Sequence, residues 1–411
     1  KPLFFHFRAQ TLVFASDVKP ILDGGWVCSQ PNEGIIAEVL SDTWYSKDET
    51  IWKDVFRIEP AQQIRFGPTR SHKREYWLPE FNRPARCTKD QDFIEQYRAL
   101  LFDTVRRQSR SHRPVSYEVS GGLDSSAIFC VAEFLRRQGE LPAPAIDGFT
   151  LDFRGDPAAD ELSYAHAVRQ HLGVTIHEIR PCYHELTWFI EEAKFSHDFP
   201  LFPNGALATG LYEQVSQSGS RVILGGIGGD HYLTGSMAYI GEEIRQGNFS
   251  YVARAISDDA RTCGYLPAAA RALRHGTVGI LPYQVRQVLH ALRRGVGGSG
   301  RIPPLWLSVS LREQLAERKR YYARSHNVRR RGQEALFRAL DYPFDILVRD
   351  LMNRLSSRYE IEIRQPFLSK ELIQLAFDTP DRMRTTGCVT KIIHRRALSE
   401  VLPKAILLRH S

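Results

Sequence analysis

The sequence predicts an α/β protein with a doubly wound parallel sheet, a helical C-terminal part and a β-rich segment at its start. Between residues 93 and 224, apolar strand-like runs alternate with segments of helical periodicity, a pattern typical of parallel sheets covered by helices on both faces. Two of these strands end in glycine-rich turns that carry an aspartate, YEVSGGLDSS and RVILGGIGGD. Ligands of open α/β sheets bind at such strand ends, so these turns are the candidate site.

The first segment, residues 1–86, shows the alternation of apolar and polar residues that is typical of strands. Pro79 and Pro84 lie in a polar stretch at its end, which we interpret as a linker. We therefore predict two units, a β-rich one over residues 1–86 and an α/β one over residues 87–411.

The second unit is expected to begin with a helix and then to alternate strands with helices. Helical spacing in FIEQYRALLFDTVRRQ precedes the strand VSYEV and the first glycine turn, and three more strands follow: AIDGFTLDF, VTIHEI and RVILGG. After Tyr239 the periodicity is almost entirely helical. Residues 240–345 are predicted to form a helical insertion, which the glycine-rich residues 295–300 interrupt.

The composition indicates a globular chain with a basic surface. The 411 residues are 43% hydrophobic and 25% charged, and the net charge of +8 favours polyanionic partners such as nucleotides, nucleic acid or acidic peptides. The most basic stretch, residues 318–331, is interpreted as a solvated helix face or loop. The six cysteines form no CxxC pair, which fits a reducing cytoplasm and argues against a zinc site. No apolar run reaches the ~18 residues of a membrane span.

The first turn, SGGLDSS, has the chemistry of a phosphate-binding loop. Gly121 and Gly122 permit a tight turn, after which the N-terminus of the next helix offers free N–H groups to an anion. The hydroxyl groups of Ser120, Ser125 and Ser126 are expected to face the same space.

The aspartates of the two turns predict a metal ion. Asp124 would repel a bare phosphate, but it suits a phosphate that carries Mg²⁺, because this ion prefers oxygen ligands. Asp230, in the second turn, can supply the second carboxylate. A single glycine turn is ordinarily only a connection from strand to helix. Two such turns with an aspartate, in one alternating pattern, predict a clamp around one Mg²⁺–triphosphate.

SGGLDSS is not followed by the GK[ST] of a Walker loop, and it resembles the PP-loop of ATP pyrophosphatases. Over nearly its whole length the chain is similar to the asparagine synthetase and β-lactam synthetase family, which includes lasso-peptide cyclases. The motifs DELSYAHAVRQHLG, VILGGIGGD, EIEIRQPFLSKELIQLAF and TKIIHRRALSEVLPKAILLR follow one another in the family's order. Residues 1–86 resemble the tail of its N-terminal glutaminase-like domain of Ntn type. The resemblance implies a PP-loop (adenine nucleotide α-hydrolase-like) sheet, with ATP and Mg²⁺ as cofactors.

The resemblance also implies roles for individual positions. Asp124 and Asp230 would ligate Mg²⁺, Lys391 would meet the phosphates, and Glu362 would lie near the acyl acceptor. ATP would be held by residues of the two turns and of a neighbouring strand end: Val119, Ser120, Gly121, Gly122, Asp124, Ser125, Leu151, Gly225 and Gly226.

Three of these positions have an alternative interpretation that involves no ligand. Leu151 is equally suited to the core, and Lys391 to an exposed helix face, where most lysines lie. Glu362 can simply pair with Arg364 or Arg358.

The second turn departs from the family at Ile227. Three residues before the second aspartate, asparagine synthetases carry a glutamate and β-lactam synthetase a tyrosine, whereas isoleucine cannot accept a proton. A general base must then come from elsewhere, and Glu362 and His231 are the candidates, although a histidine beside a glycine turn is more often structural. Glutamine-dependent members use an N-terminal cysteine nucleophile. The first cysteine here is Cys28, so we expect the chain as given not to hydrolyse glutamine.

We therefore predict an ATP-dependent carbon–nitrogen ligase that adenylates a carboxylate and forms an amide. Ile227 favours an amine that is placed by a larger substrate, as in lasso-peptide cyclases, which join the α-amine of a precursor peptide to an Asp or Glu side chain. A precursor peptide and a protease are then the expected partners. The alternatives are an asparagine synthase acting on L-aspartate, a PP-loop enzyme that modifies tRNA, and a scaffold that binds nucleotide without catalysis. Neither a membrane nor a nucleic acid is the favoured partner.

Overall fold

The computed structural model describes residues 1–67, 71–83, 89–156, 158–237, 239–280, 285, 303–322, 331–386 and 389–409. Its central sheet has five strands in the order β10-β9-β6-β7-β8, and every neighbouring pair is parallel. The strands are β6 (Val115–Glu118), β7 (Ile146–Leu151), β8 (Ile176–Ile179), β9 (Val222–Leu224) and β10 (Glu362–Arg364). The predicted parallel α/β sheet is thus confirmed. Its fifth strand, β10, is a correction, because it lies in a region that was expected to be helical.

The order of the strands creates a switch point between β6 and β9. From β6 the chain proceeds outward to β7 and β8, and it then returns to the other side of β6 to form β9 and β10. The connections that leave β6 and β9 therefore diverge, and the carboxyl ends of these two strands border a crevice. Ligands of open α/β sheets bind in such a crevice.

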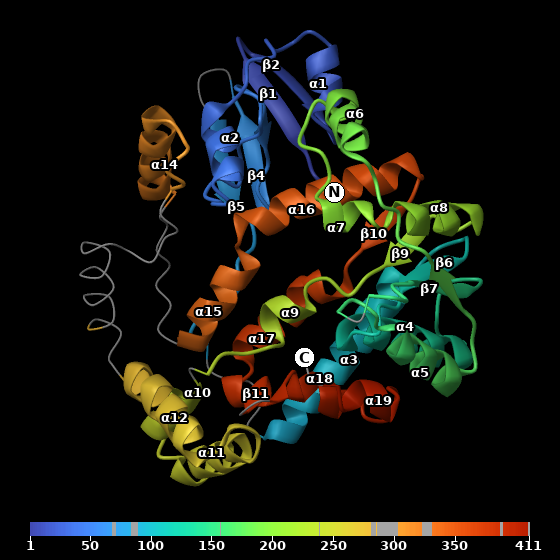
Figure 1. The fold of residues 1–411 in the computed structure, drawn as a ribbon, viewed down its shortest axis with the longest axis vertical. Helices are drawn as coiled ribbons and strands as arrows, with labels where there is room; N and C mark the ends of the chain where they lie inside the picture. The colour runs from blue at the N-terminus through green and yellow to red at the C-terminus, as the bar shows by residue number, and fades with distance from the viewer. Residues whose placement is uncertain are drawn as a thin grey trace.

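Helices cover both faces of the sheet (Figure 1). One face packs against α3, α4 and α5 around a core that includes Tyr117, Phe129 and Leu101. The other packs against α8 and α16 around Phe149, Ile223 and Tyr212. The helices are α3 (Asp90–Gln108), α4 (Leu123–Arg137), α5 (Leu162–Leu172), α6 (Leu186–Ser196), α7 (Pro203–Ala206), α8 (Thr209–Gln217) and α16 (Pro343–Arg358).

The chain after the second turn is largely helical, as predicted. In Figure 1, α11 and α12 (yellow) form a separate layer at the lower left, and the C-terminal helices (red) lie under the sheet. The predicted break at residues 295–300 lies outside the described residues. The elements are α9 (Gly229–Tyr232), α10 (Tyr239–Arg245), α11 (Phe249–Cys263), α12 (Tyr265–Ile280), α14 (Val309–Tyr321), α15 (Arg331–Leu340), α17 (Lys370–Asp378), β11 (Thr385–Thr386), β12 (Val389–Thr390), α18 (Ile392–Ala397) and α19 (Lys404–Leu407). Among the described helices, none is long and apolar enough to cross a bilayer.

The N-terminal segment contains the expected strands and two helices that were not predicted. A three-stranded antiparallel sheet has the order β2-β1-β3, and β4 pairs with β5. The small core of this N-terminal segment is formed by Phe4, Val18, Ile21, Leu22 and Val55. The elements are β1 (Phe4–Arg8), β2 (Thr11–Ala15), α1 (Lys19–Asp23), α2 (Glu33–Leu40), β3 (Phe56–Arg57), β4 (Gln62–Phe66) and β5 (Ser71–Glu75).

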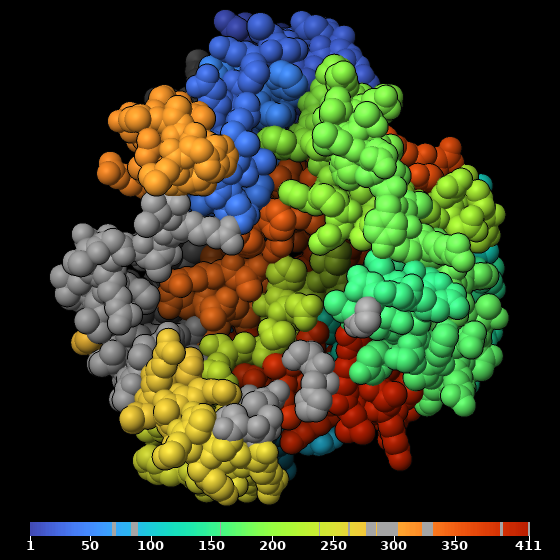
Figure 2. Space-filling model, viewed as in Figure 1, coloured from blue at the N-terminus to red at the C-terminus, as the bar shows by residue number. Residues whose placement is uncertain are grey.

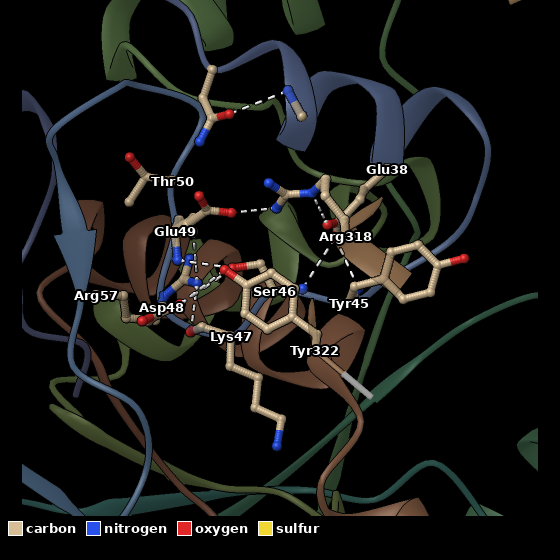
Figure 3. A network of polar contacts seen from close by, with 12 residues as sticks. Glu38, Tyr45, Ser46, Lys47, Asp48, Glu49, Thr50, Arg57, Arg318 and Tyr322 are labelled. Carbon is tan, nitrogen blue, oxygen red and sulfur yellow. Dashed lines mark hydrogen bonds and ion pairs between the residues drawn. The ribbon is translucent and has the colours of Figure 1, made fainter. Parts of the chain in front are cut away.

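A polar network joins this segment to α14 (Figure 3). The Arg318 guanidinium of α14 donates to Glu38 Oε1 at 2.6 Å and also pairs with Glu49. Glu38 accepts two further bonds, from the backbone N–H groups of Tyr45 and Ser46. Since the Glu38 side chain is 2% exposed and that of Arg318 is 14% exposed, the first residue of the basic stretch 318–331 is not solvated. The burial of Arg318 corrects the interpretation of this residue as part of a solvated surface.

Replacing Arg318 by alanine is expected to destabilise the fold by about 3 kcal/mol, because it leaves the buried Glu38 carboxylate without its cation. Burial already raises the pKa of Glu38, so the loss should shrink at low pH, where this carboxyl group binds a proton. Thermal or urea unfolding measures the effect. Lys319→Ala removes an exposed cation from the same helix and serves as the control, and equal stability of the two variants would contradict the assignment.

Candidate functional site

The two glycine turns bring their aspartates together at the switch point. Asp124 lies in the first turn of α4, directly after β6, and Asp230 lies in α9, directly after β9. Both carboxylates contact the ammonium group of Lys391, with Nζ 2.8 Å from Asp124 Oδ2 and 2.6 Å from Asp230 Oδ1. The expected meeting of the two turns at neighbouring strand ends is therefore found in the structure.

Lys391 is buried between the two aspartates. Its side chain is 5% exposed, so it is not the surface lysine of the alternative interpretation. Its backbone adopts a left-handed conformation at the N-terminus of α18, with φ 56° and ψ 37°. Non-glycine residues adopt this conformation at an energetic cost, and such residues concentrate at functional sites.

The site is asymmetric, because one carboxylate is buried and the other faces solvent. The Asp124 side chain is 9% exposed, whereas that of Asp230 is 79% exposed. Burial raises the pKa of Asp124 to about 6, the nearby Lys391 opposes this rise, and Asp230 adds to it. Asp124 Oδ1 is buried without a hydrogen-bond partner among the described residues. One oxygen of the buried carboxylate thus makes no hydrogen bond within the described part of the chain.

Two residues that were not predicted from the sequence, a tyrosine and a histidine, lie behind the buried carboxylate. His394 lies three residues after Lys391, and its Nε2 is 3.9 Å from Asp124 Oδ1. Its Nδ1 is 2.6 Å from the Tyr97 hydroxyl of α3. Burial lowers the pKa of His394 to about 3, so the ring is neutral and adds no charge beside Asp124.

Two glycines of the second turn are required by close packing. A Cβ atom on Gly226 would lie 2.7 Å from the backbone nitrogen of Ser125, and one on Gly229 would lie 2.1 Å from Asp124 Oδ2. The second turn therefore touches the first turn at Gly226 and touches Asp124 at Gly229. Any larger residue at these positions would push the two turns apart.

The serines of the first turn divide into two groups. The Oγ atoms of Ser120 and Ser125 lie 2.7 Å apart, and Ser120 is exposed at the mouth of the turn. Ser126, however, is fully buried, which corrects the expectation that it faces the ligand space. Val119 is a buried residue of the core. Leu151 packs at the edge of the other core cluster, in agreement with its alternative interpretation as a core residue.

Glu362 does not lie at the site. In β10 it is level with Val222, the first residue of β9, whereas the turn leaves β9 at its last residue, Leu224. Glu362 pairs with Arg364, which lowers the pKa of its carboxyl group. Arg364 in turn donates to the backbone oxygen of Gln108, at the end of α3 that precedes β6. The expected place of Glu362 near the acyl acceptor is thus corrected. The register puts Glu362 at the amino end of the parallel strands, whereas the turns leave their carboxyl ends.

His231 is turned towards α16. Its Nε2 lies 2.8 Å from Asp345 Oδ2, across the contact between α9 and α16. This contact makes His231 a link between two elements, and it contradicts the expectation that the histidine faces the reacting groups.

The residues present suit a magnesium ion that arrives with a nucleotide. Mg²⁺ is usually bound by one or two protein carboxylates together with phosphate oxygens and water, and Asp124 and Asp230 supply two carboxylates at one point. Within the described part of the chain, no group of three or more His, Cys, Asp or Glu side chains could hold a metal alone. The chain therefore fits a metal–phosphate complex better than an ion held only by protein.

Figure 2 shows a hollow near the centre of this face of the molecule. The yellow-green segment of α9 lies in it, between the orange helices α15 and α16 and the cyan-green part of the sheet unit. The helix α9 carries Asp230, whose side chain is 79% exposed.

Comparison with known proteins supports the assignment of these residues to one family. Amidase chyE of Penicillium rubens is 26% identical over 293 residues, which are 68% of this chain and 42% of that protein. A putative asparagine synthetase [glutamine-hydrolyzing] 2 of Methanocaldococcus jannaschii is 23% identical over 58% of this chain and 46% of its own length. Asparagine synthetase [glutamine-hydrolyzing] 1 of Bacillus subtilis is 21% identical over 100% of this chain and 63% of its own length.

The chain thus spans less than half of the first two relatives. A solved structure, the U34-tRNA thiolase NcsA from Methanococcus maripaludis with its [4Fe-4S] cluster, is 13% identical over 64% of this chain and 79% of that chain. Its TM-score of 0.25 is too low to support a conclusion. Residues 96–410 match the family described as "Asparagine synthase". This match covers both turns and Lys391, and the chain belongs to the asparagine synthase family.

Proposed function

We propose that this protein is an ATP-dependent ligase that adenylates a carboxylate and then forms an amide bond, releasing AMP and pyrophosphate. The observation that carries the proposal is the convergence of Asp124, Asp230 and Lys391 at the switch point of the sheet. Membership of the asparagine synthase family supports it, since two of the relatives above are named as asparagine synthetases and one as an amidase.

The residues of the two turns have complementary roles in this proposal. The N-terminus of α4 and the paired hydroxyls of Ser120 and Ser125 would receive the phosphates. Asp124 and Asp230 would hold Mg²⁺, which when bound neutralises charge on the polyphosphate. Lys391 would move from the two carboxylates to the phosphate oxygens and stabilise the negative charge that develops on pyrophosphate.

The preferred acyl donor is an Asp or Glu side chain of a precursor peptide, with the α-amine of the same peptide as the acceptor, as in lasso-peptide cyclases. Ile227 supports this choice, because it offers no polar group to orient a small amine. A protease that processes the precursor would be a partner, and residues 1–86 would be a remnant of a glutaminase-like domain of Ntn type. The second candidate is synthesis of asparagine from L-aspartate, which the names of the bacterial and archaeal relatives favour.

Exchange of labelled pyrophosphate into ATP tests the adenylation step directly. The probes are L-aspartate, L-glutamate and a synthetic peptide with a free α-amine and one internal Asp or Glu side chain, each with Mg²⁺. Exchange with at least one probe is expected. Exchange with none would contradict the proposal, and efficient asparagine formation from L-aspartate and ammonia would select the second candidate.

Asp124→Asn is expected to lower this exchange at least 100-fold, because the amide keeps the shape of the carboxylate but loses the charge that would hold Mg²⁺. Asp258→Asn changes a surface aspartate of α11 that is 45% exposed, and it should leave exchange unchanged. Exchange by Asp124→Asn at the rate of this control would remove Asp124 from the site.

A further inference from the structure

A carboxylate at the end of β6 has no part in the site as described so far. Glu118 is the last residue of this strand, and its Oε2 lies 2.7 Å from the point where a Cβ atom on Gly225 would stand. Gly225 opens the second turn, two residues before Ile227. The neighbouring Gly226 contacts the backbone of Ser125 in the phosphate-binding turn. Glu118 therefore lies beside the contact between the two turns, at the carboxyl end of the sheet.

Two further polar side chains surround Glu118. Gln365 Nε2 lies 3.8 Å from the same point at Gly225, and Tyr212 of α8 is close enough for the negative charge of Glu118 to raise the pKa of its hydroxyl. The Tyr212 hydroxyl and Gln365 Oε1 are buried, and neither has a hydrogen-bond partner among the described residues. Buried polar atoms without partners are rare in folded proteins. Two such atoms close to the Glu118 carboxylate point to a ligand with polar atoms of its own.

The charge on Glu118 is also uncompensated. No described side chain forms an ion pair with it, and Tyr212 is the titratable group that faces it from the packed helix α8. Burial raises the pKa of Glu118 to about 7. The residue as a whole is half-buried. A carboxylate placed only to support the fold would be expected to have a cation or N–H donors beside it.

We propose that Glu118 is the catalytic base of the amide-forming step, in place of the polar residue that Ile227 cannot provide. This inference rests on the proposed ligase function. The amine nitrogen attacks the carbonyl carbon of the acyl adenylate, and a C–N bond forms. The nitrogen then gives a proton to the Glu118 carboxylate, the bond from the acyl carbon to the AMP oxygen breaks, and AMP leaves with the electron pair. Gln365, which is half-buried, would bind the amine-bearing part of the substrate, and the buried Tyr212 would lie behind Glu118.

Glu118→Gln separates this step from adenylation, because the amide cannot accept the proton but keeps the shape of the side chain. Pyrophosphate exchange is expected to stay within twofold of the unsubstituted protein, while amide formation should fall 100-fold or more, which is the range for loss of a general base. The probes are L-aspartate with ammonium chloride and the synthetic peptide defined above. The measurement uses the probe that supports exchange in the unsubstituted protein.

The pH dependence gives a second readout. In the unsubstituted protein, amide formation should rise with pH through about 7 as Glu118 loses its proton. In Glu118→Gln this rise should vanish and leave only the rise at higher pH from deprotonation of the amine itself. Glu118→Asp should recover part of the rate and of the pH dependence.

Glu140→Gln is the matched control, because it makes the same chemical change at an exposed glutamate just after α4, and it should affect neither step. Amide formation by Glu118→Gln at the normal rate, with an unchanged pH profile, would overturn the proposal. An equal loss of exchange and amide formation would also overturn it, since Glu118 would then act in folding or nucleotide binding. Failure of the ligase function itself looks different, because the unsubstituted protein would then show no exchange with any probe.

Discussion

Lys391→Met is expected to lower pyrophosphate exchange by about 1,000-fold, the largest effect on activity of the substitutions considered. The ammonium group joins both aspartates and is the cation in position to reach the polyphosphate, and loss of a preorganised charge of this kind costs about 100-fold to 1,000-fold. Methionine fills a similar volume without charge, so the loss would reflect electrostatics. Lys404→Met, at an exposed lysine of α19, should retain full exchange, and comparable loss in both variants would contradict the role of Lys391.

The same substitution should also make stability more dependent on pH. The pKa of Asp124 is already raised to about 6 by burial against the attraction of Lys391, and without the ammonium group it should rise further. A carboxyl group with a raised pKa in the folded state favours folding at low pH, and this contribution is lost as the pH rises through the folded-state value. The difference in melting temperature between Lys391→Met and the unsubstituted protein should therefore be small at pH 5 and larger at pH 8. A constant difference would contradict the buried ion pair.

Gly229→Ala is expected to lower exchange about 100-fold and also to lower stability, because it disturbs the buried pair of Asp124 and Lys391. Its Cβ atom would lie 2.1 Å from Asp124 Oδ2, so the carboxylate must leave its place beside Lys391. A displacement of about 1 Å in a catalytic group can cost 100-fold in rate. The backbone at this position is helical, and alanine is favourable in helices, so the loss of stability should come from the displaced carboxylate and not from the backbone.

The control for this variant is Gly210→Ala in α8. A Cβ atom there would lie 2.9 Å from Cys182 Sγ, which imposes a milder clash with one side chain away from the two turns. Full exchange by Gly210→Ala together with the loss in Gly229→Ala is the expected pair of results. Normal exchange by Gly229→Ala would show that the position of Asp124 is less critical than the geometry indicates.

The sequence allowed prediction of the features whose chemistry is local. Apolar runs that end in glycine turns indicated the parallel sheet, and an aspartate in each turn indicated that Asp124 and Asp230 would meet. Both features depend on the fact that parallel strands end at the same edge of a sheet. The place of Lys391 came from family resemblance, because nothing local in VTK distinguishes it from an exposed lysine.

The features that were mispredicted depend on register and on packing between distant segments. The strand β10 has three residues, which is too short for its alternation to be recognised within a helical region. In its register with β9, Glu362 pairs with Val222, which lies two residues before the carboxyl end of β9 from which the second turn leaves. Glu118 was missed for a related reason, since its isolation is produced by the close approach of Gly225 from another strand.

Lys391, whose backbone is left-handed and whose ammonium group contacts both aspartates, lies close to the C-terminal end of the sequence. Its position determines when the site can be completed during synthesis. A chain emerging from the ribosome folds its earlier parts first, so both glycine turns can be in place long before Lys391 appears. Until then, the two aspartates lack the ammonium group that contacts both of them in the complete chain. The two aspartates and the lysine are therefore expected to come together only late in synthesis.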